Sequence, residues 1–375
     1  MKSIDPKLEL MEHSEAKVKL YGKYLATYLN ILSKVSSVNR IFVFDLLCGE
    51  GIYSNGAKGS PIIALDVMHN QYSNNLCCPN MTVWFNDNGI SDIDPNVSKI
   101  ERVKGLGNRI ELPPNVIVEY FREDYDIIYP KAVAAVNHAS HAKGLFFIDP
   151  YGYKDIKPED IRKMLYGGNI EVLLWLPISF MYRFADSALK SDFKGSEPLK
   201  GFLNALFGLS KPNFRSVYDF IDKIKGRFRA YLRDMGIFVD TFTIERNASN
   251  IYALFFFTPN LLGFQKMVET KWSMDKERGK GYMIDKSPSF FSEIELSGYP
   301  QKLMSYINSS EYRTNTELFR FGLENGFLPK HTKEILTEWK INNPNFEIVS
   351  LDQKPVLGFY LVYNSDRRVG FRIKN

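Results

Sequence analysis

Short apolar runs recur through the first half of the chain, separated by longer segments that mix polar and apolar residues. The runs lie at 41–47, 82–87, 116–121, 144–149 and 171–176. Apolar runs of this length are typical of buried strands, and the segments between them are long enough for helices. Such βα units are joined by right-handed crossovers, so the pattern predicts an α/β fold with a parallel sheet.

The same pattern predicts elements before and after these units. Ahead of the first strand, apolar residues recur at steps of three and four and predict a helix that Ser14 can cap. After the fifth strand, a long helix is expected over 214–235. Two further strand runs, 238–244 and 252–258, flank the turn-forming residues Asn247-Ala-Ser-Asn250 and predict an antiparallel hairpin at the end of the sheet.

After residue 295 the pattern changes. Two short amphipathic stretches, 316–325 and 329–342, are followed by strand-like runs at 346–351 and 357–363, and Thr314-Asn-Thr316 supplies helix caps. Helix, turn, helix and hairpin is the order of a winged helix. The chain is therefore predicted to have two domains: 1–295 carries the sheet, and 296–375 is winged-helix-like.

Composition excludes several classes of protein. With 375 residues, 45% of them hydrophobic, the chain can bury one large core or two smaller ones. No apolar stretch approaches the ~18 residues of a membrane span, and the N-terminus lacks the apolar region of a signal peptide, so we expect a cytoplasmic protein without membrane contact. Cys48, Cys77 and Cys78 show no Cys-x-x-Cys spacing, so neither a metal site nor a disulfide framework is expected.

The most informative candidate for chemistry is the end of the first strand, Ile41-Phe-Val-Phe-Asp-Leu-Leu-Cys-Gly-Glu-Gly51. Gly49 and Gly51 let the backbone turn with positive φ and let a ligand lie against the main chain, while Asp45 can accept polar hydrogens of a cofactor. The third glycine of the dinucleotide fingerprint is missing, since the next glycine is Gly56. This open loop suits S-adenosylmethionine (SAM), which has no phosphate, although an incidental strand-turn has the same residues.

A second candidate follows the fourth strand run, which closes on Asp149-Pro150-Tyr151-Gly152. Open α/β sheets bind ligands at the carboxyl ends of their strands, where this turn places a carboxylate and backbone carbonyls. Amino-methyltransferases have Asp or Asn before Pro-Pro-aromatic, and that residue accepts hydrogen bonds from an exocyclic amine. The second proline is absent here. A substrate amine, a divergent or lost activity, and a turn that merely ends a strand therefore all stay open.

Two more acidic residues follow strands. Asp87 is placed to accept from both ribose hydroxyls of a cofactor, and Asp124 to accept from its adenine amino group. Each has an alternative, because Asp87 also begins a good turn and Asp124 can cap the next helix. The segment 175–183 combines aromatic residues with Arg183 and suits stacking of a base and binding of phosphate, or else forms a buried aromatic wall.

Three segments together resemble the three-Cys-motif partner (TcmP) proteins of bacteria and phages: 44–53, Gly59-Ser-Pro-Ile-Ile-Ala-Leu65 and 147–152. These proteins are similar to class I SAM-dependent methyltransferases, with a Rossmann-like sheet and a C-terminal winged-helix-like domain. They are paired with a radical-SAM-like protein that carries the three cysteines. The resemblance implies that Asp45 and the loop of Cys48, Gly49 and Gly51 contact SAM, and that residues 149–152 lie at the reaction centre. The family more often has Ala-Gly-Pro-Gly at 48–51.

These observations favour a SAM-dependent methyltransferase that acts on nucleic acid, DNA or RNA, with a radical-SAM-like protein as partner. Residues 301–375 hold 11 Lys or Arg and 8 Asp or Glu. Their basic residues are expected to contact nucleic acid: Lys330, His331, Lys333 and Lys340 on the second helix, and Arg367, Arg368, Arg372 and Lys374 in the tail. Winged helices also dock proteins. The alternative is a non-catalytic adaptor that presents nucleic acid to the partner.

Other enzyme classes lack their motifs. The chain has no Gly-x-Ser-x-Gly elbow for a serine hydrolase and no Gly-Lys-Ser/Thr for a P-loop. The cysteine nucleophile of cytosine-C5 methyltransferases usually follows a proline, and here Cys78 precedes Pro79. The sequence therefore excludes these three alternatives.

Overall fold

The computed structural model describes residues 11–72, 78–150, 156–190, 197–208, 212–247, 250–283 and 298–374. Within them the chain forms two compact units, each treated by itself below. The first comprises the described residues up to Pro259 together with Tyr282 and Met283, and the second comprises Asn260–Gly281 and the described residues from 298 onward. Helix α9 (Leu261–Met274) thus belongs to the second unit, although it precedes the boundary expected at 295.

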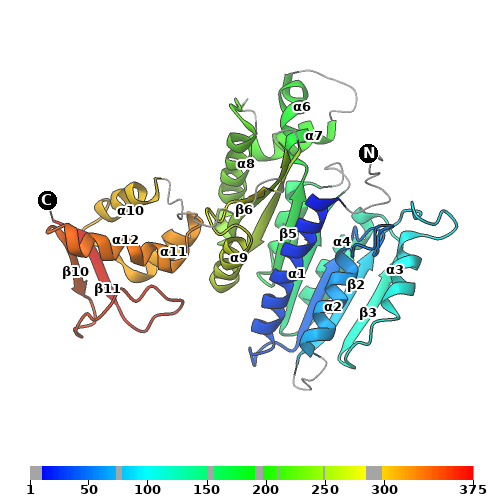
Figure 1. Ribbon diagram of the computed structural model, residues 1–375, viewed down its shortest axis with the longest axis horizontal. Helices are drawn as coiled ribbons and strands as arrows, with labels where there is room; N and C mark the ends of the chain where they lie inside the picture. Colours follow the sequence, from blue (N-terminus) through cyan, green and yellow to red (C-terminus); the bar gives the residue numbers. More distant parts are fainter. Residues whose placement is uncertain are drawn as a thin grey trace. The chain divides into compact units, whose positions relative to one another are not determined.

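An eight-stranded, mostly parallel sheet forms the centre of the first unit, in the order β3-β2-β1-β4-β5-β7-β6-β8 (Figure 1). The strands are β1 (Arg40–Asp45), β2 (Asn80–Asn86), β3 (Val116–Phe121), β4 (Ala142–Ile148), β5 (Ile170–Leu176), β6 (Phe238–Asn247), β7 (Asn250–Thr258) and β8 (Gly281–Met283). Strands β1 to β5 pair in parallel, and β7 runs antiparallel to β5 and β6. The expected α/β fold with a terminal antiparallel hairpin is confirmed.

Burial explains why the strand runs are continuous rather than alternating. Every residue of β5 is buried, and in β4 only Lys143 is partly exposed. Strands that helices cover on both faces have no polar face, so both sets of side chains are apolar. At the edge of the parallel strands, β3 keeps only Val116 buried, which fits its more polar sequence.

Helices flank this sheet. In the described part of the first unit they are α1 (Glu12–Leu32), α2 (Ser60–Tyr72), α3 (Lys99–Gly107), α4 (Tyr125–His138), α5 (Pro158–Leu165), α6 (Ile178–Lys190), α7 (Glu197–Phe207) and α8 (Val217–Tyr231), with a short 3-10 turn η1 (Arg233–Met235). The α1 side chain Tyr21 stacks on Phe147 of β4 with ring centroids 4.2 Å apart. Helices α4 to α8 share a core with Phe44 and Phe146. Because side chains alternate along a strand, residues at odd positions of β1 and β4 face α1.

The N-terminus of α1 differs from the expectation. The helix begins at Glu12 with Met11 at the N-cap position, and no side chain caps it. The backbone N–H of Ser14 donates to the carbonyl of Met11 at 2.8 Å, which places Ser14 inside the first turn. The prediction that Ser14 caps this helix is wrong. In the described residues no helix is long and apolar enough to span a membrane.

The second unit contains α9, α10 (Tyr299–Asn308), β9 (Arg313–Thr314), α11 (Asn315–Glu324), α12 (Pro329–Asn342), β10 (Phe346–Ser350) and β11 (Val369–Ile373). Its three strands form an antiparallel sheet in the order β10-β11-β9. The two expected helices are confirmed, and Thr314 caps α11 in a capping box with Glu317. From α9, Trp272 Nε1 donates to the carbonyl of Gly326 at 2.9 Å and ties that helix to this unit.

The expected strand at 357–363 is wrong, since the partner of β10 is β11 instead. The segment lies in the loop between these strands, and one arginine accounts for its shape. The Arg367 guanidinium donates to Asp352 at 2.8 Å, to the carbonyl of Pro355 at 2.9 Å and to Tyr360 Oη at 2.9 Å. Tyr360 has a φ of 51°, which no strand residue adopts. One arginine side chain therefore ties together positions 352, 355 and 360 of the loop.

Candidate functional site

The glycine loop follows β1 and closes on itself before α2. Gly49 and Gly51 have φ values of 67° and 77°, which glycine adopts without strain. A Cβ on Gly51 would lie 3.1 Å from Val103 Cγ2, so a larger residue would have to displace Val103 in addition to adopting the positive φ. The backbone N–H of Gly59 donates to the carbonyl of Gly51 at 2.6 Å and closes the loop. The loop is thus held in one conformation at the carboxyl end of β1.

Asp45 ends β1 with a fully buried carboxyl group. Among the described residues, neither of its oxygens has a hydrogen-bond partner. Burial raises the pKa of Asp45 to about 8, and the charges of Asp149 and Asp87 add to the rise. The Ser60 hydroxyl and the Leu47 backbone N–H lie near enough to oppose the rise, although neither meets the geometry of a hydrogen bond. A buried polar group without a partner costs free energy, so this carboxyl group is suited to a ligand that brings a positive charge or hydrogen-bond donors.

Asp87 lies just after β2 and holds two backbone amides. Its Oδ2 accepts from Gly49 N at 3.0 Å, and its Oδ1 accepts from Gly89 N at 2.8 Å. The second contact is the turn that the sequence offered as an alternative, and the first clamps the glycine loop. A carboxylate has about four acceptor positions, so both contacts leave room for ribose hydroxyls, and that role stays a prediction.

Two other residues expected to contact a cofactor lie near this loop. Cys48 is buried, and burial raises the pKa of its thiol, with the charges of Asp45 and Asp87 adding to the effect. Asp124 stands at the N-cap position of α4, yet its side chain makes no capping hydrogen bond. It instead accepts from Asn88 Nδ2 at 2.6 Å and joins the loops after β2 and β3. Its contact with adenine stays a prediction.

Glu50, between the two glycines, is a residue that the sequence did not single out. It is buried, and its carboxylate accepts from Ser91 Oγ at 2.8 Å and from Asp92 N at 2.7 Å. Arg102 of α3 lies 3.6 Å from the same carboxylate. Glu50 therefore anchors the glycine loop to the segment that leads into α3. The sequence feature that could have identified Glu50 is its position between the two glycines of the turn.

Asp149 follows β4 and carries an unexpected partner from α1. The ammonium of Lys17 donates to Asp149 Oδ1 at 2.8 Å and to Oδ2 at 2.7 Å. The Lys17 side chain is 7% exposed and that of Asp149 is 25% exposed. Lys17 lies one turn before Leu20 and Tyr21, so the helical period places it on the buried face of α1. A lysine on that face is the sequence feature that could have identified this partner. Pro150 is buried, whereas Tyr151 and Gly152 lie outside the described residues.

Aromatic rings surround this ion pair. The Lys17 ammonium lies 5.0 Å from the ring centroid of Tyr252 and 5.9 Å from that of Trp175. His13, one turn earlier in α1, stacks on Tyr252 at 4.6 Å. Burial lowers the pKa of His13 to about 4, with the Lys17 charge adding to the effect, so this histidine is neutral at neutral pH. Asp149 thus lies beside aromatic rings and the Lys17 ammonium, and the charge of Arg246 also acts on His13 and Tyr252.

Residues in and next to the segment 175–183 fit both expected roles, the buried aromatic wall and the stacking of a base. Trp175 is 1% exposed and belongs to the buried wall. Phe180 and Phe184, on α6, are 48% and 38% exposed, with ring centroids 4.8 Å apart, and Arg183 is exposed beside them. An exposed aromatic pair next to a cation fits stacking of an unpaired base. No three His, Cys, Asp or Glu residues of the described chain gather as a metal site.

In the second unit, the basic residues serve different purposes. Lys330 and Lys333 of α12 and Arg368 are exposed. His331 is instead fully buried and packs against Trp272 with ring centroids 4.2 Å apart, and burial lowers its pKa to about 4. The expectation that His331 contributes to a basic surface is therefore wrong. Arg367 shapes its own loop, as described above, and its contact with nucleic acid stays a prediction.

The tail residues Arg372 and Lys374 both contact Glu347 of β10, at 2.8 Å and 2.5 Å.

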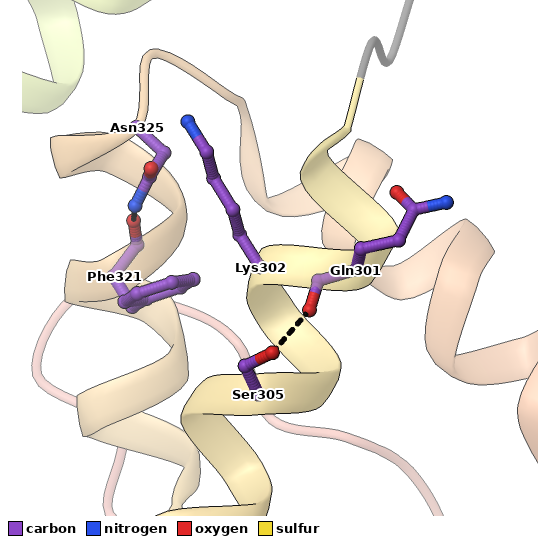
Figure 2. Close-up of a pocket in the computed structure, with 5 residues that line it drawn as sticks. All are labelled: Gln301, Lys302, Ser305, Phe321 and Asn325. Carbon is purple, nitrogen blue, oxygen red and sulfur yellow. Dashed lines mark hydrogen bonds between the residues drawn. The ribbon is translucent and has the colours of Figure 1, made fainter.

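An open pocket of about 450 Å³ lies between α10 and α11 (Figure 2). Two of its polar side chains are satisfied by their own helices, because Ser305 donates to the carbonyl of Gln301 and Asn325 to that of Phe321, both at 2.9 Å. None of the residues predicted to form a site lines this pocket.

Comparison with protein-family models finds no match, and comparison with curated proteins finds none. Solved structures that are similar include Trm1 from Pyrococcus horikoshii with S-adenosyl-L-methionine, at 14% identity and a TM-score of 0.38 over 68% of this chain. The chain spans 58% of that structure's length. An O-methyltransferase from Bacillus cereus with S-adenosylhomocysteine (SAH) shows 11% identity and a TM-score of 0.31, covering 68% of this chain and 92% of that one. At these values the likeness assigns no activity to the chain.

Proposed function

We propose that this protein is a SAM-dependent methyltransferase. The observation that carries the proposal is the buried Asp45 carboxyl group, which lacks a partner in the described chain and lies beside a fixed glycine loop. SAM carries positive charge on its sulfonium and amino groups, so it supplies what Asp45 lacks. Asp45, Gly49 and Gly51 would hold it, and Asp87 would hold its ribose. When bound, SAM supplies an activated methyl group.

The residues of the chain contribute positioning and charge. The glycine loop presents backbone groups, and Asp87 keeps that loop in place through Gly49 N at 3.0 Å. Asp149 and the Pro150 carbonyl, at the end of the neighbouring strand β4, would orient the acceptor nitrogen. The aromatic rings near Asp149 would exclude water and stack on a planar acceptor. Holding two reactants in this way replaces a bimolecular step by a unimolecular one.

Binding of SAM is expected to release a proton at pH 7. The pKa of Asp45 is about 8 in the empty protein, so the group is mostly protonated at pH 7, and a bound cation favours its ionised form. Calorimetry in buffers of different ionisation enthalpy measures this release as a change in apparent binding enthalpy. Asp45→Asn is the control for protons that SAM itself exchanges. No binding heat with the wild type contradicts the cofactor assignment, and the same buffer dependence in both proteins contradicts the role of Asp45.

We further propose that the acceptor is nucleic acid, DNA or RNA, held in part by a winged-helix-like second unit. The order α10, β9, α11, α12, β10, β11 with an antiparallel sheet supports this assignment. Lys330 and Lys333 lie exposed on α12, the second helix of the expected helix-turn-helix, and Arg368 lies exposed just before β11. A radical-SAM-like protein is the proposed partner, on the basis of the TcmP resemblance.

A second candidate function is the non-catalytic adaptor. Two observations favour it: Asp149 already carries a partner in Lys17, and the second unit exposes large apolar side chains. Leu357, in the loop between β10 and β11, is 88% exposed, and Ile341 at the end of α12 is 76% exposed. Such side chains suit a protein-docking surface.

Reversing Lys330, Lys333 and Arg368 to Glu tests whether the second unit binds nucleic acid or docks a protein. Each phosphate contact that is lost should flatten the salt dependence of nucleic-acid binding by about 0.9 units of slope. Arg367 stays unchanged, because it shapes its loop. Lys302→Glu on α10 is a control for a single charge reversal outside the proposed surface. Binding is measured by fluorescence anisotropy over a salt series. Normal binding by the triple variant, with loss of a protein partner, supports the docking module.

A further inference from the structure

An amine from the chain itself lies where the acceptor amine is expected. Asp149 was predicted to accept hydrogen bonds from a substrate nitrogen, and the nitrogen on both of its oxygens is Lys17 Nζ, at 2.8 Å and 2.7 Å. These contacts link positions 132 residues apart. The ion pair therefore places a primary amine of the chain on the carboxylate that is proposed to orient the acceptor nitrogen.

The position of Lys17 relative to the cofactor loop follows from the sheet. Strands β1 and β4 are parallel neighbours, and Asp45 pairs with Phe147. Asp149 lies just past the end of β4, and its partner Lys17 belongs to α1, which also contacts Phe147 through Tyr21. The charge of Asp149 also contributes to the raised pKa of Asp45, so the two carboxyl groups are close enough to interact. Lys17 Nζ thus lies just past the carboxyl end of β4, the strand that pairs with the one leading into the glycine loop.

The surroundings suit a methylated ammonium as well as a free one. Tyr252 and Trp175 lie 5.0 Å and 5.9 Å from Nζ, and cation–π attraction requires no N–H donor. The Lys17 side chain is only 7% exposed, so solvent and other acceptors have little access to it. Other lysines of α1 differ, because Lys19 and Lys23 are exposed.

From this arrangement we infer that Lys17 is a methyl acceptor of the protein's own site. The inference rests on the proposed function, since the methyl group comes from SAM. Lys17 Nζ first gives one proton to the Asp149 carboxylate, and its lone pair then forms a bond to the methyl carbon. The S–C bond breaks with its electron pair going to sulfur, which leaves neutral SAH and a methylammonium on Lys17. Asp149 returns its proton to solvent.

The geometry also limits how many methyl groups are added. A monomethylated Lys17 keeps two N–H groups, enough to retain both hydrogen bonds to Asp149, whereas a trimethylated one keeps none. One methyl group per chain is therefore the expected main product. The first step takes a proton from an ammonium that is held in an ion pair, so the reaction is expected to be slow.

The test measures the mass of the chain and locates any added methyl group by peptide sequencing. Purified full-length protein is analysed before and after incubation with isotopically labelled SAM at pH 7, 8 and 9. A single methyl group on Lys17, present at purification or gained on incubation, is the expected result. It should be absent from Lys17→Arg, Asp149→Ala and Gly51→Val, and unaffected in Lys19→Arg. Equal labelling of Lys19 and Lys23 overturns the inference, because it shows unselective chemistry.

Calorimetry supplies a second measurement that does not depend on methyl transfer. Lys17→Met leaves the Asp149 charge facing the cofactor without a lysine beside it, so SAM affinity should rise at least about threefold. SAH lacks the sulfonium charge, so its affinity should rise little in this variant. Equal changes for SAM and SAH mean that Lys17 lies away from the sulfonium and overturn the inference. If SAM binds and Lys17 stays unmodified at every pH, the inference fails while the proposed function stands. If SAM does not bind, both fail.

Discussion

Replacing Gly51 with valine is expected to abolish SAM binding. The φ of 77° at this position costs a β-branched residue about 1–2 kcal/mol, and the contact with Val103 at 3.1 Å adds overpacking of about 1–3 kcal/mol. The loop relieves this strain by moving away from the conformation that binds the cofactor. A loss of about 2–5 kcal/mol corresponds to at least roughly 30-fold in affinity. Calorimetric titration with SAM measures it.

The matched control is Gly168→Val. Gly168 has a φ of 66° but no neighbour within 4 Å of its Cβ position, and it lies before β5, away from the glycine loop. It should lower the free energy of unfolding without changing SAM affinity. Should Gly168→Val weaken SAM binding as much as Gly51→Val does, general destabilisation rather than the loop explains the result.

Loss of methyl transfer on replacing Asp149 is the second large effect expected. Removing a group aimed at the reacting atoms typically costs on the order of 100-fold or more in rate. Asp149→Ala also leaves the Lys17 ammonium without its partner. Because the Lys17 side chain is only 7% exposed, this loss destabilises the fold by about 3–5 kcal/mol. The single variant therefore mixes two effects. Transfer of labelled methyl from SAM to DNA and RNA, in the presence of the proposed partner protein, measures the first.

The double variant Lys17→Met, Asp149→Ala separates these effects. It removes both charges, so the fold and the SAM affinity should stay near those of the wild type, within about threefold for affinity. Methyl transfer should remain lost. Recovery of transfer in the double variant shows that Asp149 acts only as the partner of Lys17. Unfolding by urea and calorimetry with SAM check stability and affinity in the same samples.

The elements of the first unit could be predicted because their signals are local. A strand buried on both faces requires consecutive apolar residues, and the runs at 41–47 and 171–176 show it directly. The ends of these strands also located Asp45, Asp87 and Asp149 at one edge, since parallel strands end on the same side. In the second unit, Thr314-Asn-Thr316 supplied the expected caps, and in the structure Thr314 caps α11, with Glu317 completing a capping box.

Local signals failed where a distant side chain decided the conformation. The apolar run at 357–363 has the composition of a strand, yet Arg367 binds Asp352, the Pro355 carbonyl and Tyr360 and holds the segment in a loop. Ser14 has the chemistry of an N-cap, yet the helix starts earlier. His331 was expected to be basic and is buried against Trp272, which lies in a helix that the sequence assigned to the other domain.

The sequence by itself determined the parallel sheet, its terminal hairpin, the glycine loop and the acidic residues at the strand ends, because each depends on neighbouring residues or on a simple period. Only the tertiary structure decided what those acidic residues contact. It left Asp45 buried without a partner in the described chain, bound Asp87 to Gly49, and paired Asp149 with Lys17 across 132 positions. Ionisation and hydrogen bonding depend on burial and on charges brought close in space, and no local pattern encodes either.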